Sequence, residues 1–213
     1  MQIGQISEID LTRYSNQFSS YTELRLHENT SLQIALLNGD VIANTRDTNG
    51  GVSTRVFDQG AWGFSSNANM TNDSIESTIQ AATKNAAFLA KRTGDPEAGL
   101  PRSNATASHD FRTSLPRKSQ EEIIAFLKSC DDYIVESCPE ITSRQVGLNT
   151  LDMEKKLLTS EGSNGHNVNT RALMSFKLSA KDDEGEPVEL MEGFGDRGQF
   201  EDVFPNLDEV KRR

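Results

Sequence analysis

The chain has 213 residues, of which 35% are hydrophobic and 25% are charged, and its formal net charge at pH 7 is -10. A chain of this length can bury one large core or two small ones. The acidic balance argues against a nucleic-acid partner, because binding to a phosphate backbone relies on clustered Lys and Arg. The one basic cluster, Lys211 to Arg213, is short and is typical of a solvated helix end.

Targeting signals and cysteine usage favour the cytoplasm. No apolar run approaches the roughly 20 residues of a membrane span, so no membrane partner is expected. The segment Met1 to Thr12 contains Glu8 and Asp10 and lacks the basic-then-apolar order of a signal peptide. In a chain without such a peptide, Cys130 and Cys138 are expected to be free thiols. We therefore predict a cytoplasmic protein.

Consecutive strands are predicted over Tyr21 to Ser66, after a short helix or extended arm at Glu8 to Phe18. Asn38-Gly39 supplies the two positive-φ residues of a hairpin turn between alternating apolar positions. Asn49-Gly50-Gly51 is expected to break the chain again, and Asp58-Gln59-Gly60 to form the next turn. This pattern predicts a meander of four or five strands.

A helix is predicted to follow the meander. Asp73 is the expected N-cap, and Glu76 completes a capping box three residues later. Gly94 is expected to end the helix. Apolar residues at helical spacing predict the face that packs on the meander, namely Ile75, Ile79, Ala82, Ala86 and Leu89.

A boundary between two units is predicted after this helix. From Asp95 to Lys118 the sequence is rich in Pro, Gly and small polar residues, which is typical of a linker. The expected organisation is therefore a first unit at 1–94, a linker at 95–118 and a second unit at 119–213.

The second unit also combines a helix with strands. Ser119 and Glu122 form a capping box at the start of the helix. Its predicted apolar face consists of Ile123, Leu127, Cys130 and Ile134. Alternation from Val168 to Ala180 predicts the clearest strand, and Ile141 to Leu148 and Val188 to Glu192 predict weaker ones. The predicted fold class is α+β, with two small units that each pack a mostly antiparallel or mixed sheet against a helix.

The residues by themselves predict no catalytic, metal-binding or cofactor-binding site. Zinc hydrolysis typically uses two histidines on adjacent helical turns with a glutamate beside them. His27, His109 and His166 are far apart in the sequence and are expected to be surface or strand residues. Neither Cys130 nor Cys138 has a local basic environment that would lower the pKa of its thiol. A catalytic arrangement whose members meet only in space stays open.

Two further segments are interpreted as structural. Gly193 to Gly198 matches Gly-x-Gly-x-x-Gly, but no strand-helix-strand unit surrounds it, so we expect the exit of a strand. Asp182 to Glu186 lacks the alternating spacing of a calcium loop and predicts the tip of a hairpin.

Several motifs together resemble the N-terminal part of the TldD/PmbA metallopeptidase family, historically called modulators of DNA gyrase. In the first unit these are the strand Tyr21 to His27, the Asn38-Gly39 turn, the segment Arg55 to Ser66 and the helix after Asn69-Met70-Thr71. In the second unit they are Ser160-Glu161-Gly162, the strand through Arg171, and Gly193 to Phe204. Within the first set, Gly60 to Phe64 with its Trp and Phe is more similar to the zinc-bearing, TldD-like branch.

The resemblance implies two small α/β units followed by a β-rich C-terminal domain, in which a His-Glu-x-x-x-His helix and a later cysteine hold zinc. None of these ligands matches a position in this chain before Arg213, so none is carried over. Zinc is expected only in a C-terminal domain that is absent here. The resemblance also implies pairing with a related TldD/PmbA subunit, in dimers that enclose a cavity for unfolded peptides.

The leading hypothesis is a non-catalytic N-terminal portion of a TldD-like zinc metallopeptidase, which serves subunit assembly and the enclosure of a peptide substrate. It would be either truncated or encoded separately from its catalytic half. Asp208 to Arg213 resembles the opening of a helix that is cut short, because no C-cap glycine or proline follows. An alternative is a stand-alone binding or regulatory module that occupies a dimer interface of the family. A third, an independent hydrolase that uses Asp, Glu and His of this chain, is the least favoured.

Overall fold

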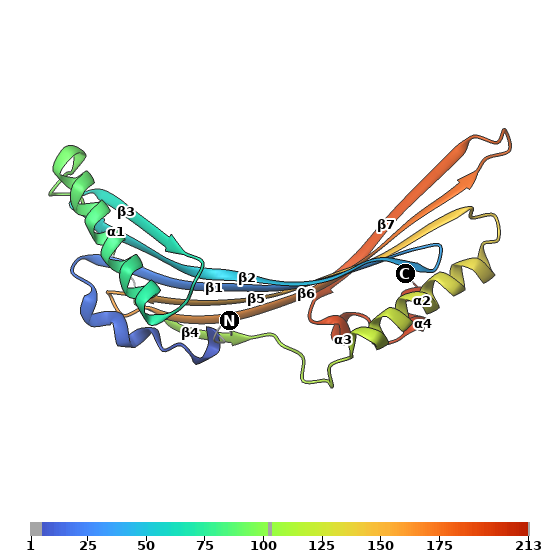
Figure 1. Ribbon diagram of the computed structural model, residues 1–213, viewed down its shortest axis with the longest axis horizontal. Helices are drawn as coiled ribbons and strands as arrows, with labels where there is room; N and C mark the ends of the chain where they lie inside the picture. Colours follow the sequence, from blue (N-terminus) through green and yellow to red (C-terminus); the bar gives the residue numbers. More distant parts are fainter. Residues whose placement is uncertain (1–5, 102–103, 213) are drawn as a thin grey trace. The chain divides into compact units, whose positions relative to one another are not determined.

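The computed structural model describes residues 6–101 and 104–212 (Figure 1). Residues 1–5 of the segment Met1 to Thr12, residues 102 and 103 of the predicted linker, and Arg213 of the basic cluster lie outside the described residues. Among the described residues, no helix is both long enough and apolar enough to cross a membrane.

Seven strands form a mixed sheet in the order β3-β2-β1-β5-β6-β4, and β7 also pairs with β6. The strands are β1 (Tyr21–Leu37), β2 (Asp40–Asp58), β3 (Ala61–Asn67), β4 (Thr106–Asp110), β5 (Ser143–Thr159), β6 (Asn164–Lys181) and β7 (Pro187–Arg197). The helices are η1 (Ile6–Glu8), η2 (Leu11–Gln17), α1 (Asn72–Thr93), α2 (Gln120–Ser137), α3 (Phe200–Val203) and α4 (Leu207–Lys211). Strands β2 and β3 and strands β6 and β7 are antiparallel, whereas β4 is parallel to β6. The predicted α+β class is therefore confirmed.

Contacts divide the chain into two compact units, each made of three segments. Unit 1 is Met1–Asn29, Thr48–Asp110 and Met153–Val168, and unit 2 is Thr30–Asp47, Phe111–Asp152 and Asn169–Arg213. The segments interleave because each of the long strands β1, β2, β5 and β6 contributes residues to both units. The contiguous division at 1–94, 95–118 and 119–213 stays a prediction about domains.

The N-terminal meander is partly as predicted. Asn38 and Gly39 have φ of 50° and 84°, which confirms the first turn, and Asp58-Gln59-Gly60 forms the second. The predicted break at Asn49-Gly50-Gly51 is wrong, so the meander has three strands rather than four or five. These glycines are needed inside β2, because a Cβ on Gly50 would lie 2.3 Å from the carbonyl oxygen of His27. Gly50 and Gly51 therefore allow close strand approach instead of a turn.

The structure describes two further predicted segments that precede α2. The arm at Glu8 to Phe18 forms the 3-10 helices η1 and η2, and the side chain of Asp10 caps the second by accepting a bond from the amide of Thr12. The predicted linker at 95–118 contains strand β4. Sequence alternation could not reveal β4, because all of its residues are exposed and only its pairing with β6 defines it.

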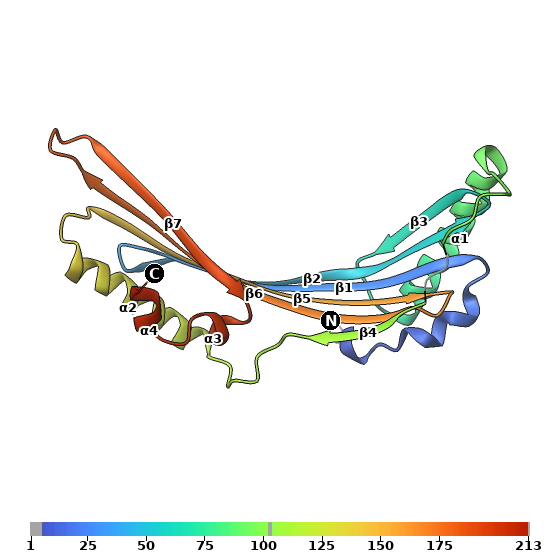
Figure 2. The same cartoon turned by 180° about the vertical axis from the view of Figure 1, so that it is seen from behind.

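Unit 1 buries its core between the meander and α1. The predicted face of α1 is confirmed at Ile75, Ile79, Ala82 and Ala86, whereas Leu89 is exposed. The predicted N-cap Asp73 is wrong, because Thr71 has the extended backbone of a cap and accepts a bond from the amide of Ser74. Gly94 ends the helix as predicted, but without a left-handed backbone. Figures 1 and 2 show α1 alongside β3, which it contacts closely.

Unit 2 packs α2, α3 and α4 on its strands. The capping box of Ser119 and Glu122 is confirmed, and Cys130 is buried on the predicted face of α2. Its core also contains Leu32, Ile34, Leu36, Val146, Leu148, Met174, Phe200 and Phe204. Cys130 and Cys138 are both free thiols, as expected. Figure 2 shows α4 next to α2, in agreement with their contacts.

The two weaker strand predictions were too short. β5 continues to Thr159 and β7 to Arg197. The charged residues of β5 interrupt its apolar pattern and hid its length, and three of them contact residues outside the strand. The side-chain amide of Gln199 donates to Asp152, a ring nitrogen of His166 lies within hydrogen-bond distance of Glu154, and the ammonium of Lys156 donates to the carbonyl of Ile9.

Candidate functional site

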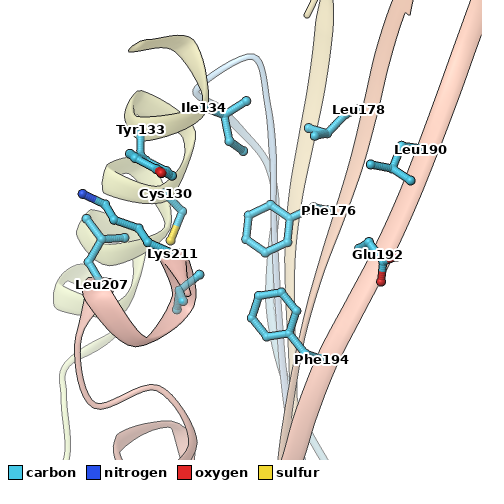
Figure 3. Close-up of a pocket in the computed structure, with 11 residues that line it drawn as sticks. Cys130, Tyr133, Ile134, Phe176, Leu178, Leu190, Glu192, Phe194, Leu207 and Lys211 are labelled. Carbon is cyan, nitrogen blue, oxygen red and sulfur yellow. The ribbon is translucent and has the colours of Figure 1, made fainter. Parts of the chain in front are cut away.

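An apolar groove in unit 2 is the best candidate for a binding site. Its sheet wall is formed by Phe176 and Leu178 of β6 and by Leu190 and Phe194 of β7 (Figure 3). The rings of Phe176 and Phe194 are stacked, with their centroids 5.5 Å apart. These residues lie on one face because Phe176 and Leu178, like Leu190 and Phe194, are separated by an even number of positions along an extended strand.

The opposite wall of the groove comes from helices. Cys130, Tyr133 and Ile134 of α2 face the sheet together with Leu207 and other residues of α4. The walls enclose about 220 Å³ of space. The ammonium of Lys211 lies 4.3 Å from the centre of the Tyr133 ring, and in Figure 3 it points away from the sheet. The groove therefore offers an almost wholly apolar interior.

One side of the groove borders an open strand edge. Within the described part of the chain, β7 pairs with β6 and with no other strand. Val188 and Leu190 are 51% and 55% exposed, and Met191 on the opposite face is 73% exposed. An edge strand presents unpaired backbone groups that can pair with another extended chain. The apolar groove and this edge thus form a continuous surface.

The hairpin that carries this edge is acidic. Its tip is the predicted one, since Asp182 accepts bonds from the amides of Glu184 and Glu186 and Gly185 has a φ of 87°. Glu189 is paired with Lys177 at 3.1 Å between Oε2 and Nζ. Further along β7, Glu192 lines the groove. The acidic residues outnumber the lysines of the hairpin, so the edge carries a net negative charge.

Cys130 in the groove is not suited to nucleophilic catalysis. Burial raises the pKa of its thiol to about 12, and the nearby charge of Lys211 lowers it only in part. A thiol of this kind is almost entirely protonated at neutral pH, and the thiolate is the nucleophilic form. This agrees with the interpretation of Cys130 as a core residue.

The three histidines do not come together as a metal site. A ring nitrogen of His27 lies 2.8 Å from the side-chain oxygen of Asn29, and His166 lies 2.7 Å from Glu154. His109 lies in β4. Within residues 6–101 and 104–212, no group of three or more His, Cys, Asp or Glu side chains could hold a metal ion. The donors that the structure describes therefore do not fit the zinc ion of the resembled family.

The segment Arg55 to Ser66 forms an aromatic and ionic cluster in unit 1. Arg55 donates to Glu23 at 2.7–3.0 Å and lies 4.7 Å above the ring centre of Trp62, which also contacts Tyr21 edge-on. Burial opposes ionisation of Glu23, but the bonds from Arg55 and the charge of Arg25 outweigh it and keep the pKa of Glu23 below its ordinary value. This cluster joins β1, β2 and β3. Because the Arg55 guanidinium and the Glu23 carboxylate already bind each other, the cluster is interpreted as structural.

The Gly-x-Gly-x-x-Gly segment is a strand exit, as predicted. Gly193 and Gly195 lie in β7, and Gly198 has a φ of 128° in the turn before α3. The amide of Gly198 donates to the carbonyl of Thr170 on β6. No phosphate-binding helix follows, because α3 spans only Phe200–Val203.

The sequence did not identify the groove. The alternation of Val188, Leu190, Glu192 and Phe194 was the available signal, since it places one face of β7 toward α2 and α4. It could not show that, among the residues the structure describes, the other side of β7 has no neighbouring strand, or that α2 leaves space above the sheet.

These features define a two-unit α+β protein with an open edge and an apolar groove. Sequence models for "PmbA/TldA metallopeptidase domain 1" and "PmbA/TldA metallopeptidase central domain" match residues 22–86 and 113–213. The chain therefore belongs to the TldD/PmbA family and corresponds to an N-terminal portion of it, as the resemblance indicated. Comparison with the curated proteins finds no match.

Solved structures have a similar fold. A protein described as a modulator of DNA gyrase from Bacteroides thetaiotaomicron has a TM-score of 0.67 and 13% identity, over 94% of this chain and 47% of that one. Another from Thermotoga maritima has a TM-score of 0.70 and 14% identity, over 95% and 44%. TldE from Thermococcus kodakarensis has a TM-score of 0.61 and 12% identity, over 88% and 42%. The chain thus spans less than half of each structure, and these identities show the fold alone.

Proposed function

We propose that this chain is the non-catalytic N-terminal portion of a TldD-like zinc metallopeptidase, in which it serves subunit assembly and the enclosure of an unfolded peptide substrate. The observation that carries the proposal is the open edge of β7 beside the apolar groove. Edges of this kind pair with extended chains through backbone hydrogen bonds, whatever the sequence of those chains.

The catalytic zinc belongs elsewhere under this proposal. The described donors of this chain do not form a zinc site, and the two matching family models are those of the first and central domains. A peptidase zinc needs three protein ligands and an open position. The partner is therefore expected to carry the His-Glu-x-x-x-His helix, either as a catalytic half or as a related TldD/PmbA subunit.

Affinity purification of the tagged chain from its native cell, followed by mass spectrometry and a proteolysis assay, tests this proposal. We expect a partner with a His-Glu-x-x-x-His sequence, and a complex that degrades an unfolded polypeptide such as denatured casein until zinc is chelated. The chain by itself should not cleave the same substrate. Cleavage by the isolated chain that survives chelation, or a complex without such a partner, would contradict the proposal.

A stand-alone regulatory module is the second candidate, because the same open edge could occupy a dimer interface of the family. The two candidates predict different results when the chain is added to an assembled family peptidase. Addition of a regulatory module should lower the rate of proteolysis by displacing a subunit, whereas the leading proposal predicts no inhibition.

A further inference from the structure

The geometry of β7 specifies which side chains of a bound strand would meet the groove. Leu190 and Glu192 are two residues apart and both line the groove, whereas Met191 between them lies on the other face. A strand added to the open edge also alternates its side chains between the two faces, and its residues lie directly opposite those of β7. Two of its side chains, two positions apart, would therefore lie next to Leu190 and next to Glu192.

The two positions have different chemistry. The neighbour of Leu190 enters the apolar space between the sheet and α2, where exclusion of water favours an aliphatic or aromatic side chain. The neighbour of Glu192 lies next to a carboxylate that forms no hydrogen bond or ion pair with any residue in the described ranges. Most other charges along β7 and at the hairpin tip are also negative. Opposite charges at paired positions stabilise a strand pair, and like charges destabilise it.

We propose that this edge binds an extended peptide in which an apolar residue and a Lys or Arg stand two positions apart, with the apolar side chain in the groove and the basic one beside Glu192. The inference rests on the proposed function, because it names the class of peptide that the chain would enclose. The bound peptide forms a new outer strand next to β7.

A palindromic probe tests the spacing without requiring knowledge of strand direction. The peptide Ser-Arg-Ser-Leu-Ser-Arg-Ser places Leu and both Arg side chains on one face of a strand. Its isomer Ser-Ser-Arg-Leu-Arg-Ser-Ser has the same composition and charge but places Leu and Arg on opposite faces. Both peptides carry a fluorescent label, and binding to the isolated full chain is measured by anisotropy at low salt. We expect the first peptide to bind at least about fivefold more tightly.

Two modified probes test strand addition itself. One carries N-methyl groups on the amides of the serines, and the other on those of Arg and Leu. In a strand at an edge, alternate residues direct their amides toward the neighbour. One modified probe should therefore lose binding and the other should retain it. Equal binding of both would show that the peptide does not pair with β7.

Variants with matched controls assign the site. Glu192→Lys should weaken binding of the palindromic peptide about tenfold, and Glu192→Gln should weaken it less. Glu97→Lys makes the same charge change on an exposed loop of unit 1 and should leave affinity unchanged. Leu190→Ser should also reduce affinity, whereas Phe88→Ser on exposed α1 should not. Circular dichroism melting checks that each variant is folded.

The results separate this inference from the proposed function. Equal affinity for both isomers, equal losses in Glu97→Lys and Glu192→Lys, or no binding of either peptide would overturn the peptide specificity. A dimer that forms through β7 and dissociates in Leu190→Ser, seen by light scattering, would overturn it in favour of a second copy of this chain. Failure to find a zinc-bearing partner would instead contradict the proposed function, because peptide binding is measured on the isolated chain.

Discussion

The two units place a long helix against their strands in different ways. In unit 1, α1 lies directly on β3, where Gly63 meets Ala82 and Ala86. A Cβ built on Gly63 would lie 2.2 Å from the carbonyl oxygen of Ala82 and 2.3 Å from the amide nitrogen of Ala86. In unit 2, the facing residues are large, and the stacked Phe176 and Phe194 leave about 220 Å³ of space below α2 and α4.

This difference shows how side-chain size decides whether a helix closes over a sheet. Small residues let backbones approach and leave no room for a ligand, as at Gly63, Ala82 and Ala86. In unit 2, large side chains such as Phe176 and Phe194 keep α2 and α4 away from the strands and do not fill the space between them. A groove therefore remains between the helices and the sheet. The interface of α1 with β3 in unit 1 is therefore closed, whereas the layer between α2 and the strands of unit 2 leaves a groove.

The largest expected loss of stability comes from a substitution that removes the ionic contact between α2 and β5. Asp131 is buried and accepts bonds from Arg144 Nε and Nη2 at 2.9 and 3.1 Å, which ties α2 to β5. Asp131→Ala should lower the free energy of unfolding by about 3 kcal/mol, because it leaves a mostly buried guanidinium without its carboxylate. Urea denaturation measures the change. Asp132→Ala, at an exposed neighbour, is the control and should have little effect; equal losses in both would refute the role of the pair.

A smaller loss should follow when the closed interface of unit 1 is forced apart. Gly63→Ala adds a methyl group against the backbone of α1, so α1 must shift. We expect the free energy of unfolding to fall by about 2 kcal/mol. Gly99→Ala is the matched control, since its Cβ would meet no atom within 4 Å. A neutral Gly63→Ala would mean that α1 is not closely seated on β3.

A pH-dependent effect is expected at the ionic cluster of unit 1. The pKa of Glu23 is lowered in the folded state, so its ionisation adds stability above its ordinary pKa of 4.5, and this stability is lost as the pH falls through the lower folded pKa. Arg55→Met should cost about 1 kcal/mol at pH 7, discounted because Arg55 is partly exposed. Thermal melts from pH 7 to 3 should show the difference between the two proteins shrinking as the pH falls below 4.5. A constant difference across this range would contradict the assignment.

The last prediction concerns the chemical reactivity of Cys130 and involves no change in stability. Burial raises the pKa of its thiol from the ordinary value of 9.0 to about 12, so much less thiolate is present at pH 8 in the folded protein than in the unfolded chain. Iodoacetamide should modify Cys130 far more slowly in the native protein than in the chain unfolded by urea. Peptide mapping by mass spectrometry measures the rates. Similar native and unfolded rates would show that the groove opens often.

Several elements were predictable because their signals are local. The turn at Asn38-Gly39, the box at Ser119 and Glu122, and the apolar stripe of α1 depend on residues within a few positions of one another. The break expected at Gly50 was wrong for the opposite reason. Gly50 lies against His27 of β1 and Gly51 lies against Asn67 of β3, and no local pattern can show these contacts.

The groove in unit 2 could be predicted even less well, because local patterns do not show contacts between distant residues. Alternation in β7 predicted a strand, but the sequence could not say that its outer edge lacks a partner in the described structure or that Glu192 faces an apolar groove. Both facts depend on residues from α2, β6 and α4, which are separated by many positions in the chain.

The sequence by itself determined the α+β class, the main helices, the free thiols and, through its motifs, membership of the TldD/PmbA family. These properties depend on local periodicity and on short motifs. Only the tertiary structure decided how the long strands divide between two units, how tightly each helix sits on its strands and where an edge stays open. Packing depends on side chains that meet across long separations in sequence, and their summed volumes determine whether an interface closes or leaves a groove.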